Sequence, residues 1–465
     1  MRTSVVGGQL AGPEGLVAAD LLCEDGVIAA ITAPGATGPA DEVVDARGHV
    51  VFPGFIDPHV HSRDPGSLAK EDFAHSTKAA LMAGVTTVFE MPNAVPPVTN
   101  VDVLRERAER HESSAHTDFG LWGQALGAEN LDDLPGLYDA GVVGVKVFWG
   151  YALDRESKRL VYNTGDLGPD AVVPAPDSGA MLAILETASR VGGLVAAHCE
   201  DRSIIEAAER AVPKPVESYS DFMRARPALA EEVSIRIATA LAEATKARFH
   251  VLHVASGAAM RAVRAARTAG VDLSAETCPH YLFLSDEDYD LLGTRMKVYP
   301  PIGAKDDQSA LRAAIRSGDI ASVGSDHAPH APEEKDGNLD STPAGIRGAD
   351  TMVPLMIDAW LRGEFTVQEI VRVLAWSTAD RFGVRHRKGR IQVGLDADLT
   401  IVDPAAEWTL QAEHLHSLHR ESVFEGRELR GRVTAVVRHG VLVARDGTLV
   451  AEVPGRFVPA ERPRS

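Results

Sequence analysis

Residues 53–66 read PGFIDPHVHSRDPG, and the apolar run VVFPGFID over 50–57 predicts a buried strand that leads into this stretch. His59 and His61 lie two positions apart, so on an extended chain both imidazoles point to the same side and can hold one cation. The alternative is a surface loop with two ordinary histidines. The apolar run before them favours metal binding.

Further apolar runs follow and alternate with Ala-rich, helix-like stretches such as SIRIATALAEATKA (234–247). They are GVTTVFEMP (84–92), GVVGVKVFW (141–149), GLVAAHCE (193–200), RFHVLHVAS (248–256), VDLSAETCP (271–279) and IASVGSDHA (320–328). Strands that are apolar throughout and alternate with helices indicate a parallel sheet buried on both faces. The pattern predicts an α/β fold, a TIM-like (β/α)8 barrel rather than an open doubly wound sheet.

The two ends of the chain have a different texture. Residues 1–52 and 386–465 contain short, Gly- and Val-rich alternating segments, such as EVVDARGHVV (42–51) and TAVVRHGVLVARDG (434–447), which are typical of strands joined by turns. We expect both ends to form one small β-sandwich, with the barrel spanning 53–385.

Composition excludes several classes of protein. The 47 basic and 66 acidic residues give a net charge of −19, which argues against nucleic-acid or anionic-membrane partners. No apolar run approaches the length of a membrane span, and no phosphate-binding glycine motif follows a strand. Three distant cysteines form no disulfide framework, and the start MRTSVVGGQL lacks a signal-peptide profile, so we expect a cytoplasmic protein.

Lys146 stands inside the apolar run GVVGVKVFW, where an unpaired ammonium group is costly to bury. Carbamylation by CO₂ would convert this amine into an anionic carboxylate able to bridge two metal ions. The alternatives are a lysine that reaches the barrel mouth or one that is paired with an acid.

Other strand-like runs also end in metal-binding residue types. His198 closes GLVAAHCE and His253 closes RFHVLHVAS, each placed like a ligand, although a single such histidine is more often a hydrogen-bonded core residue. His250, three residues before His253, faces the other way on a strand and is the better candidate for a structural role. Asp326 follows IASVGS and can bind metal and accept a proton, or cap a turn.

Together these residues are His59, His61, Lys146, His198, His253 and Asp326. Imidazole and oxygen ligands without a thiolate suit Zn²⁺, with Mn²⁺ or Co²⁺ as substitutes. Six ligands are too many for one catalytic zinc, so we expect a pair of divalent metal ions that share a hydroxide.

The sequence resembles the cyclic amidohydrolases of the metal-dependent amidohydrolase superfamily, a group of dihydroorotases, allantoinases and dihydropyrimidinases (hydantoinases). The motifs are PGFIDPHVHSRDPG, the Lys146 segment, AAHCE, HVLHVAS, ETCPHYL, SDHAPHAPEEK and GRIQVGLDADLTIVDP, spread over nearly the whole chain. The resemblance implies a TIM-like barrel with a β-sandwich from both termini. It also implies that His59 and His61 bind the first metal, His198 and His253 bind the second, carbamylated Lys146 bridges them, and Asp326 binds the first metal and shuttles the proton.

The resemblance is mixed as to which ring is opened. Arg63, Asn93 and His330 resemble the substrate-binding residues of dihydroorotases, and an Arg fork suits a carboxylate. In contrast, Tyr151 lies where hydantoinases keep an oxyanion-stabilising tyrosine, and 299–303 (YPPIG) lacks two polar positions of the dihydroorotase pattern. We expect a dihydroorotase-like enzyme acting on a small, carboxylated cyclic amide, with allantoinase or hydantoinase activity as the alternative.

In the expected mechanism the hydroxide shared by the metals attacks the ring carbonyl, whose oxygen is polarised by a metal and by Tyr151, while Asp326 passes the proton to the leaving nitrogen. The alternative from another class is a non-catalytic relative that uses the same barrel for assembly. Such a protein would be expected to lose metal ligands, whereas this chain keeps all six.

Two further expectations concern the surface. The polar, Pro- and Gly-rich stretch 151–180 has the composition of a loop that covers the barrel mouth, or of a passive excursion. Relatives of this kind often form dimers or tetramers, which makes a homo-oligomer the expectation.

Overall fold

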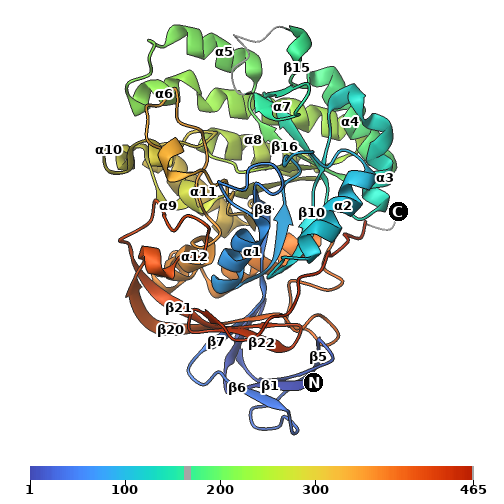
Figure 1. Cartoon of the computed structure of the whole chain (residues 1–465), viewed down its shortest axis with the longest axis vertical. Helices are drawn as coiled ribbons and strands as arrows, with labels where there is room; N and C mark the ends of the chain where they lie inside the picture. The colour runs from blue at the N-terminus through green and yellow to red at the C-terminus, as the bar shows by residue number, and fades with distance from the viewer. Residues whose placement is uncertain (162–168, 463–465) are drawn as a thin grey trace.

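The computed structural model describes residues 1–161 and 169–462, and its centre is a parallel barrel (Figure 1). Eight strands form it within the described residues: β8 (Phe55–Val60), β9 (Val85–Glu90), β10 (Asp118–Leu121) continued by β11 (Gly123–Gln124), β12 (Val145–Trp149), β16 (Leu194–Cys199), β17 (Arg248–Val251), β18 (Leu273–Thr277) and β19 (Ser322–Val323). The ring closes between the last strand and the first, where the His61 N–H donates to the His327 carbonyl oxygen at 2.8 Å. The predicted barrel is confirmed.

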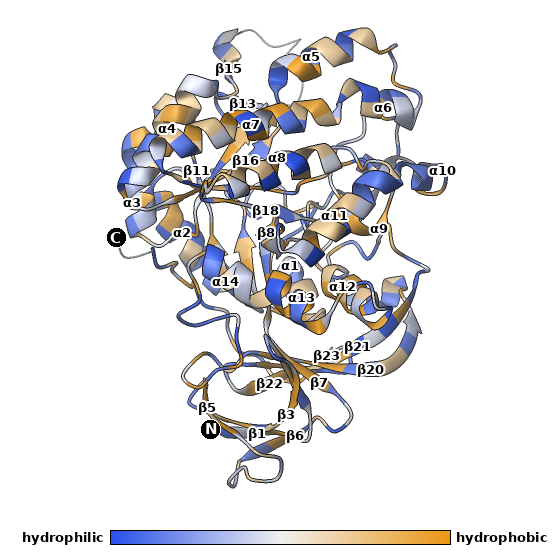
Figure 2. Cartoon of the chain, turned by 180° about the vertical axis from the view of Figure 1, so that it is seen from behind, coloured by the Kyte–Doolittle hydropathy of each residue, from blue (hydrophilic) through white to orange (hydrophobic). Residues whose placement is uncertain are grey.

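The barrel strands are the continuous apolar runs of the sequence. Every residue of β8, β9, β12, β16 and β18 is buried, because helices cover the outside and side chains fill the inside. Figure 2 shows hydrophobic residues along these inner strands and mixed helices around them. The helices are α1 (Phe73–Met82), α2 (Val101–Glu112), α3 (Leu134–Asp139), α4 (Ser178–Arg190), α5 (Arg202–Ala211), α6 (Tyr219–Ala225), α7 (Ala228–Thr245), α8 (Gly257–Thr268), α9 (Pro279–Phe283), α10 (Tyr289–Leu292), α11 (Lys305–Ser317), α12 (Met352–Leu361), α13 (Val367–Val371) and α14 (Ser377–Arg381).

Side-chain caps begin several of these helices. The Asp72 carboxylate accepts the backbone N–H of His75 at the start of α1, and Ser256 accepts that of Ala259 at the start of α8. The Ser256 cap lies five residues after β17, so the chain turns there from strand to helix at the face where polar side chains gather, whereas a longer loop separates β8 from the Asp72 cap. No helix of the described residues has both the length and the apolar character needed to cross a membrane.

The second unit is a sandwich of two sheets built from both ends of the chain. One sheet, in the order β23-β22-β21-β20-β7-β2-β3, combines β2 (Gln9–Gly12), β3 (Gly15–Ala18) and β7 (Val50–Pro53) with β20 (Leu399–Thr409), β21 (Glu428–Arg438), β22 (Val441–Arg445) and β23 (Thr448–Leu449). The other, in the order β5-β4-β1-β6, holds β1 (Arg2–Val6), β4 (Asp20–Glu24), β5 (Val27–Thr32) and β6 (Glu42–Asp45). Their facing side chains make a separate apolar core that includes Leu21, Val51 and Leu399.

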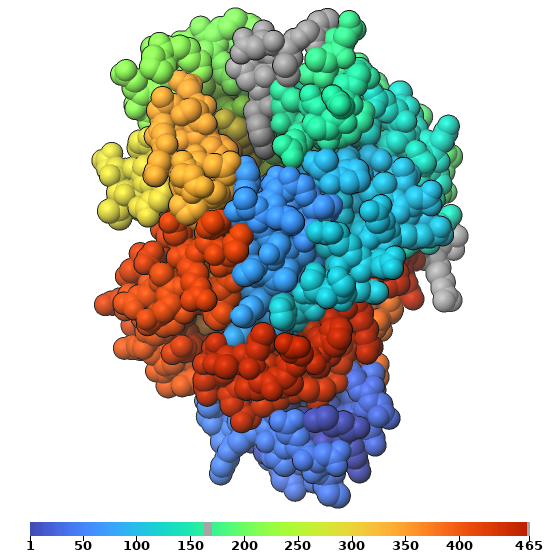
Figure 3. Space-filling model, viewed as in Figure 1, coloured from blue at the N-terminus to red at the C-terminus, as the bar shows by residue number. Residues whose placement is uncertain are grey.

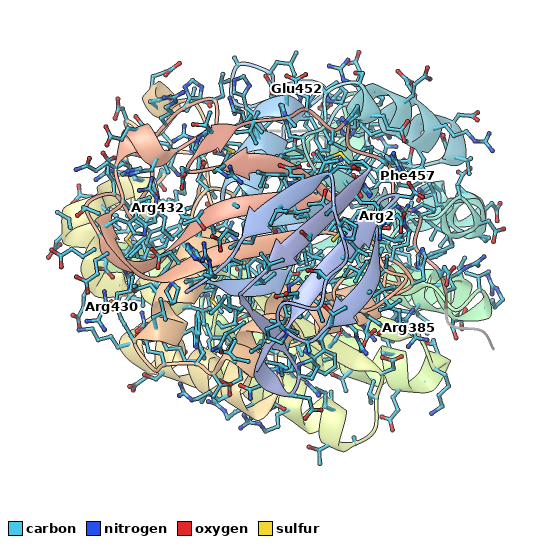
Figure 4. The ribbon with its side chains drawn as sticks, turned by 90° about the horizontal axis from the view of Figure 1, so that it is seen from below. Arg2, Arg385, Arg430, Arg432, Glu452 and Phe457 are labelled. Atoms are coloured by element: carbon cyan, nitrogen blue, oxygen red, sulfur yellow. The ribbon has the colours of Figure 1, made fainter. Side chains whose placement is uncertain are left out.

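The figures show how the two ends interleave. In Figure 3 a band of C-terminal residues lies between the N-terminal residues and the rest of the molecule, and Figure 4 shows strands from both ends side by side from below. The antiparallel pairing of β20 with β7 joins them. The predicted sandwich of both termini is therefore confirmed, while the exact limits 1–52, 53–385 and 386–465 stay a prediction.

The last described residues leave the sandwich, in contrast to the expectation for 386–465. The Val458 N–H donates to the Phe119 carbonyl oxygen at 2.8 Å, and Phe457 forms a bridge with Phe119 of β10. Val458 is fully buried in an apolar cluster with Trp122 and Phe382. Burial of Val458 in this cluster explains why the chain returns to the barrel.

The stretch 151–180 differs from a plain loop. Its described part contains β13 (Ala152–Asp154), β14 (Leu160–Val161) and β15 (Val172–Val173), which pair in a small antiparallel sheet, and α4 begins at Ser178. Leu153, Leu160 and Val173 pack with Leu126, and this burial orders what composition predicted as loop. Residues 162–168 of the predicted cover lie outside the described residues.

The Lys388 ammonium group joins the barrel to the sandwich. Its Nζ lies 2.5 Å from Asp118 Oδ2 in β10, 2.6 Å from Asp398 Oδ2 and 2.8 Å from Asp396 Oδ2, and all four side chains are buried. The three carboxylates keep the Lys388 ammonium group charged in the protein interior. Removal of this cation would therefore leave buried, uncompensated negative charge.

We therefore expect Lys388→Met to lower the free energy of unfolding by about 3–5 kcal/mol, measured by urea denaturation. Lys305→Met is the matched control, because the Lys305–Glu287 ion pair is 65% exposed on both sides and its loss should leave stability nearly unchanged. Equal stability of the two variants would contradict the role of Lys388.

Candidate active site

The carboxyl ends of the barrel strands open into one pocket, a cavity of about 60 Å³. Its lining residues are His61, Arg63, Asn93, Lys146, Phe148, Tyr151, Leu160, His198, His253, Val298, Tyr299, Asp326, Ala328, Ala344 and Gly345. Side chains predicted from separate strand ends thus meet in space. This is the face at which barrel enzymes carry their chemistry.

His59, His61 and Asp326 form the first group of possible metal ligands. His59 Nε2 lies 3.3 Å from His61 Nε2 and 3.2 Å from Asp326 Oδ1, and His61 Nε2 lies 3.5 Å from the same oxygen. Ligand atoms held 2.0–2.2 Å from a tetrahedral zinc ion are about 3.3–3.6 Å apart. The three donors therefore fit around one divalent cation.

His198 and His253 form a second pair. His198 Nδ1 lies 3.1 Å from His253 Nε2, again about the separation of two nitrogens on one zinc ion. The two groups are neighbours, since the ring of His253 lies 5.4 Å from that of His59 between centroids. The donor set thus fits two adjacent ions better than one.

Burial sets the protonation of these ligands. It lowers the pKa of His61 to about 4, and it lowers the pKa values of His59 and His253 well below the usual range. Burial opposes ionisation of Asp326, but His59 and a hydrogen bond with His61 hold the pKa of Asp326 well below its usual value. Neutral imidazole and ionised carboxylate are the forms that bind metal.

Lys146 extends from β12 into this pocket and is 1% exposed. Burial lowers the pKa of its amine to about 8, against the opposing effect of Asp326 and Glu276. Its Nζ lies 4.6 Å from the centre of the Phe148 ring. Lys146 is therefore deeply enclosed beside both groups of ligands, as its place inside an apolar run predicts.

Two glutamates that hold the ligand rings were not singled out from the sequence. Glu276 Oε1 lies 2.5 Å from His59 Nδ1, and Glu200 Oε2 lies 2.7 Å from His198 Nε2. A carboxylate on the far ring nitrogen fixes the tautomer and the direction of a ligating histidine. The sequence could have indicated both glutamates, because each is a charged residue near the end of a buried strand run.

Asn93 and His250 also support the ligands, Asn93 by direct contact with His61 and His250 by contact with Glu276. Asn93 Oδ1 lies 2.7 Å from His61 Nδ1, so the Asn93 amide supports His61 besides lining the pocket. His250 has Nδ1 2.7 Å from Ser274 Oγ and Nε2 3.4 Å from Glu276 Oε2, which agrees with the structural role expected for it.

Tyr151 lies at the pocket within a buried polar network. Its hydroxyl donates to Glu200 Oε2 at 2.7 Å and accepts from Arg226 Nη1 at 3.1 Å. The Arg226 guanidinium also stacks over Tyr299, 3.7 Å from the ring centre. Arg226 and Glu200 therefore position Tyr151, and only the tertiary structure reveals this arginine, since the segment RARP carries no site signal of its own.

The predicted substrate-binding residues separate into two places. Arg63 lines the pocket, and its Nε donates to the Pro329 carbonyl oxygen at 3.1 Å. His330 is absent from the described pocket wall, because its Nε2 lies 3.0 Å from the Ala344 carbonyl oxygen and its Nδ1 faces Lys70 Nζ at 3.2 Å. The structure thus places His330 behind the wall formed by Ala344 and Gly345.

Three site residues have positive backbone φ angles: Arg63 (63°), His253 (37°) and Asp326 (44°). Such angles are uncommon for residues with a side chain and persist where the surrounding structure holds them. Here they occur just after barrel strands, where the backbone turns and directs each side chain inward.

Comparisons with known proteins find relatives with three different names. Allantoinase from Rubrobacter xylanophilus is 36% identical over 454 residues, covering 96% of this chain and 95% of that protein. Dihydroorotase from Halalkalibacterium halodurans is 32% identical, covering 95% and 98%. The crystal structure of L-hydantoinase from Arthrobacter aurescens superposes with a TM-score of 0.91 at 28% identity, covering 98% and 99%.

The expected nearest branch needs correction, because the allantoinase match is stronger than the dihydroorotase match. The broader expectation of a metal-dependent hydrolase of cyclic amides is supported by all three relatives and by the grouped donors. The sequence profile of the amidohydrolase family matches residues 50–443, so this chain belongs to the amidohydrolase family.

Proposed function

We propose that this protein is an allantoinase, a hydrolase that opens the five-membered cyclic ureide ring of allantoin with the help of two divalent metal ions. The observation that carries the proposal is the pair of donor groups at the carboxyl ends of the strands, His59, His61 and Asp326 beside His198 and His253. All of them except His59 line one pocket, and His59 lies directly against His61 and Asp326. The choice of ring is supported by 36% identity with an allantoinase over nearly the entire chain.

In this proposal His59, His61 and Asp326 would hold one ion, His198 and His253 would hold the other, and Lys146, once carbamylated, would supply a further oxygen ligand. Zn²⁺ suits these ligands, and Mn²⁺ or Co²⁺ can substitute. When bound, the ions supply an activated water and polarise the ring carbonyl. Carbamylation accounts for a lysine that is almost fully buried beside the histidines.

The side chains of the chain supply proton transfer and positioning. Asp326 receives the proton of the attacking water and delivers it to the leaving ring nitrogen. Arg63 and Asn93 orient the ring from the pocket wall. Tyr151 polarises the carbonyl oxygen once its hydroxyl turns from Glu200 toward the pocket, and His330 supports the wall from behind.

Dihydroorotase activity is the second candidate. Arg63 favours it, because a guanidinium group at the pocket wall suits a substrate that carries a carboxylate. Two features favour allantoinase activity. Tyr299 lines the pocket beside Tyr151, and Gly303 stands at a position where the dihydroorotase pattern has a polar residue.

The metal-loaded protein should be incubated separately with allantoin, hydantoin, dihydroorotate and dihydrouracil, and loss of each ring followed by chromatography. We expect allantoin to show the highest kcat/KM, by at least about 10-fold over dihydroorotate. Opening of dihydroorotate alone would instead establish the second candidate.

Asp326→Asn should reduce kcat by at least about 100-fold, because the amide cannot accept the transferred proton. Metal analysis of the same preparation should find both ions, since an amide oxygen remains beside His59 and His61. Undiminished ring opening by this variant would disprove the proton-transfer role.

Glu276→Gln should weaken metal binding by about 10–100-fold, because His59 loses the carboxylate that fixes its ring. Chelator competition measures the affinity. Glu231→Gln is the matched control, since Glu231 is equally buried but bonds the Ala255 N–H and the Ser256 hydroxyl. Equal affinities in the two variants would contradict the role of Glu276.

A further inference from the structure

A second cluster of possible ligands lies beneath the pocket and shares Asp326 with the first. Cys278 follows β18, and His280 stands in the first turn of α9. One possible ligand atom from each of Cys278, His280 and Asp326 lies within 4.8 Å of the others, and all three residues are buried. Cys278 and His280 do not line the pocket, and the function proposed above gives neither of them a role.

The histidine of this cluster has unused binding capacity. His280 is 1% exposed, and its Nε2 has no hydrogen-bond partner among the described residues. Buried polar atoms are nearly always satisfied, so an orphaned imidazole nitrogen in a protein interior calls for a partner that the chain does not supply. A cation is such a partner, because neutral imidazole donates a lone pair to it.

Acidic groups outnumber basic ones around the cluster. The carboxyl groups of Asp326, Glu276 and Asp57 act electrostatically on Cys278, and Lys146 acts against them. No lysine of the described residues forms an ion pair within the cluster, in contrast to the group Asp118, Asp396 and His439, where Lys388 bonds two of the carboxylates directly.

Cys278 is also free for this use. It is one of three unpaired, buried cysteines, and although it precedes α9 as the N-cap residue, its side chain makes no capping hydrogen bond. A thiolate next to imidazole and carboxylate is a donor set that selects soft or borderline ions such as Zn²⁺ and Cd²⁺ over Mg²⁺ or Mn²⁺.

We propose that Cys278, His280 and Asp326 form a third, inhibitory cation site that binds Zn²⁺ in excess or another thiophilic divalent ion. Binding forms a sulfur–metal bond and releases the thiol proton to the solvent. In the function proposed above one oxygen of Asp326 would bind the first ion, and the third ion would take the other oxygen, so the carboxylate can no longer transfer the proton during ring opening. The inhibitory part rests on the function proposed above, whereas the binding site itself does not.

The test uses the protein loaded with two equivalents of Zn²⁺ and titrated with Cd²⁺. We expect a third bound equivalent in metal analysis after gel filtration, an ultraviolet thiolate-to-cadmium absorption band, and a fall in ring-opening rate of about 100-fold at saturation. Cys278→Ser should keep the first two ions and the basal rate, and should lose both the absorption band and the inhibition. His280→Gln should weaken binding of the third ion by at least about 10-fold.

Cys23→Ser is the matched control, because Cys23 is equally buried but lies in the sandwich, so this variant should behave as the unmodified protein. The proposal is wrong if the unmodified protein binds no third equivalent, or if Cys278→Ser still shows the band and the inhibition. A band without inhibition disproves the inhibitory role alone. If no ring is opened at all, the function proposed above fails, while stoichiometry and absorption still decide the site.

Discussion

The structure depends on keeping several uncharged imidazoles buried and correctly directed at one end of a closed barrel. Glu276, Glu200 and Asn93 share this task, and Glu276 contacts His59 in β8 and His250 in β17 from its own position in β18. Burial keeps these rings uncharged, and the carboxylate fixes their tautomer and prevents their rotation. The closing hydrogen bond from the His61 N–H to His327 holds the strand end in register.

Stability and chemistry occupy opposite ends of the same strands. Asp118 begins β10 and takes part in the buried ion cluster with Lys388 that ties the barrel to the sandwich. The ligand groups, by contrast, lie at or just after the carboxyl ends of β8, β16, β17 and β19. The net charge of −19 does not exclude an active site for small polar rings, because positive charge is supplied locally. At the active-site end of the barrel it comes from Arg63, Arg226 and the expected metals. Lys388 supplies positive charge at the opposite end.

In the proposed function the metal ligands and the pocket wall determine different things: the ligands the type of reaction, and the wall the choice of ring. The donors His59, His61, His198, His253 and Asp326 suit hydrolysis of cyclic amides in general, and relatives named allantoinase, dihydroorotase and hydantoinase all match nearly the entire chain. Discrimination among rings must come from the wall. Arg226 shapes one part of that wall through Tyr151 and Tyr299, and Ala344 and Gly345 form another part in front of His330.

The sequence by itself determined the barrel, the sandwich of both ends and the grouping of the six candidate ligands, because apolar runs that end in polar residues have few other solutions in a parallel fold. It did not reveal Arg226 or the place of His330. Those depend on which loops pack together over the strand ends, and contacts between distant loops leave no periodic pattern along the chain. Only the tertiary structure decided that Tyr151 bonds a glutamate, that Asn93 supports His61 and that Cys278 and His280 lie beside Asp326.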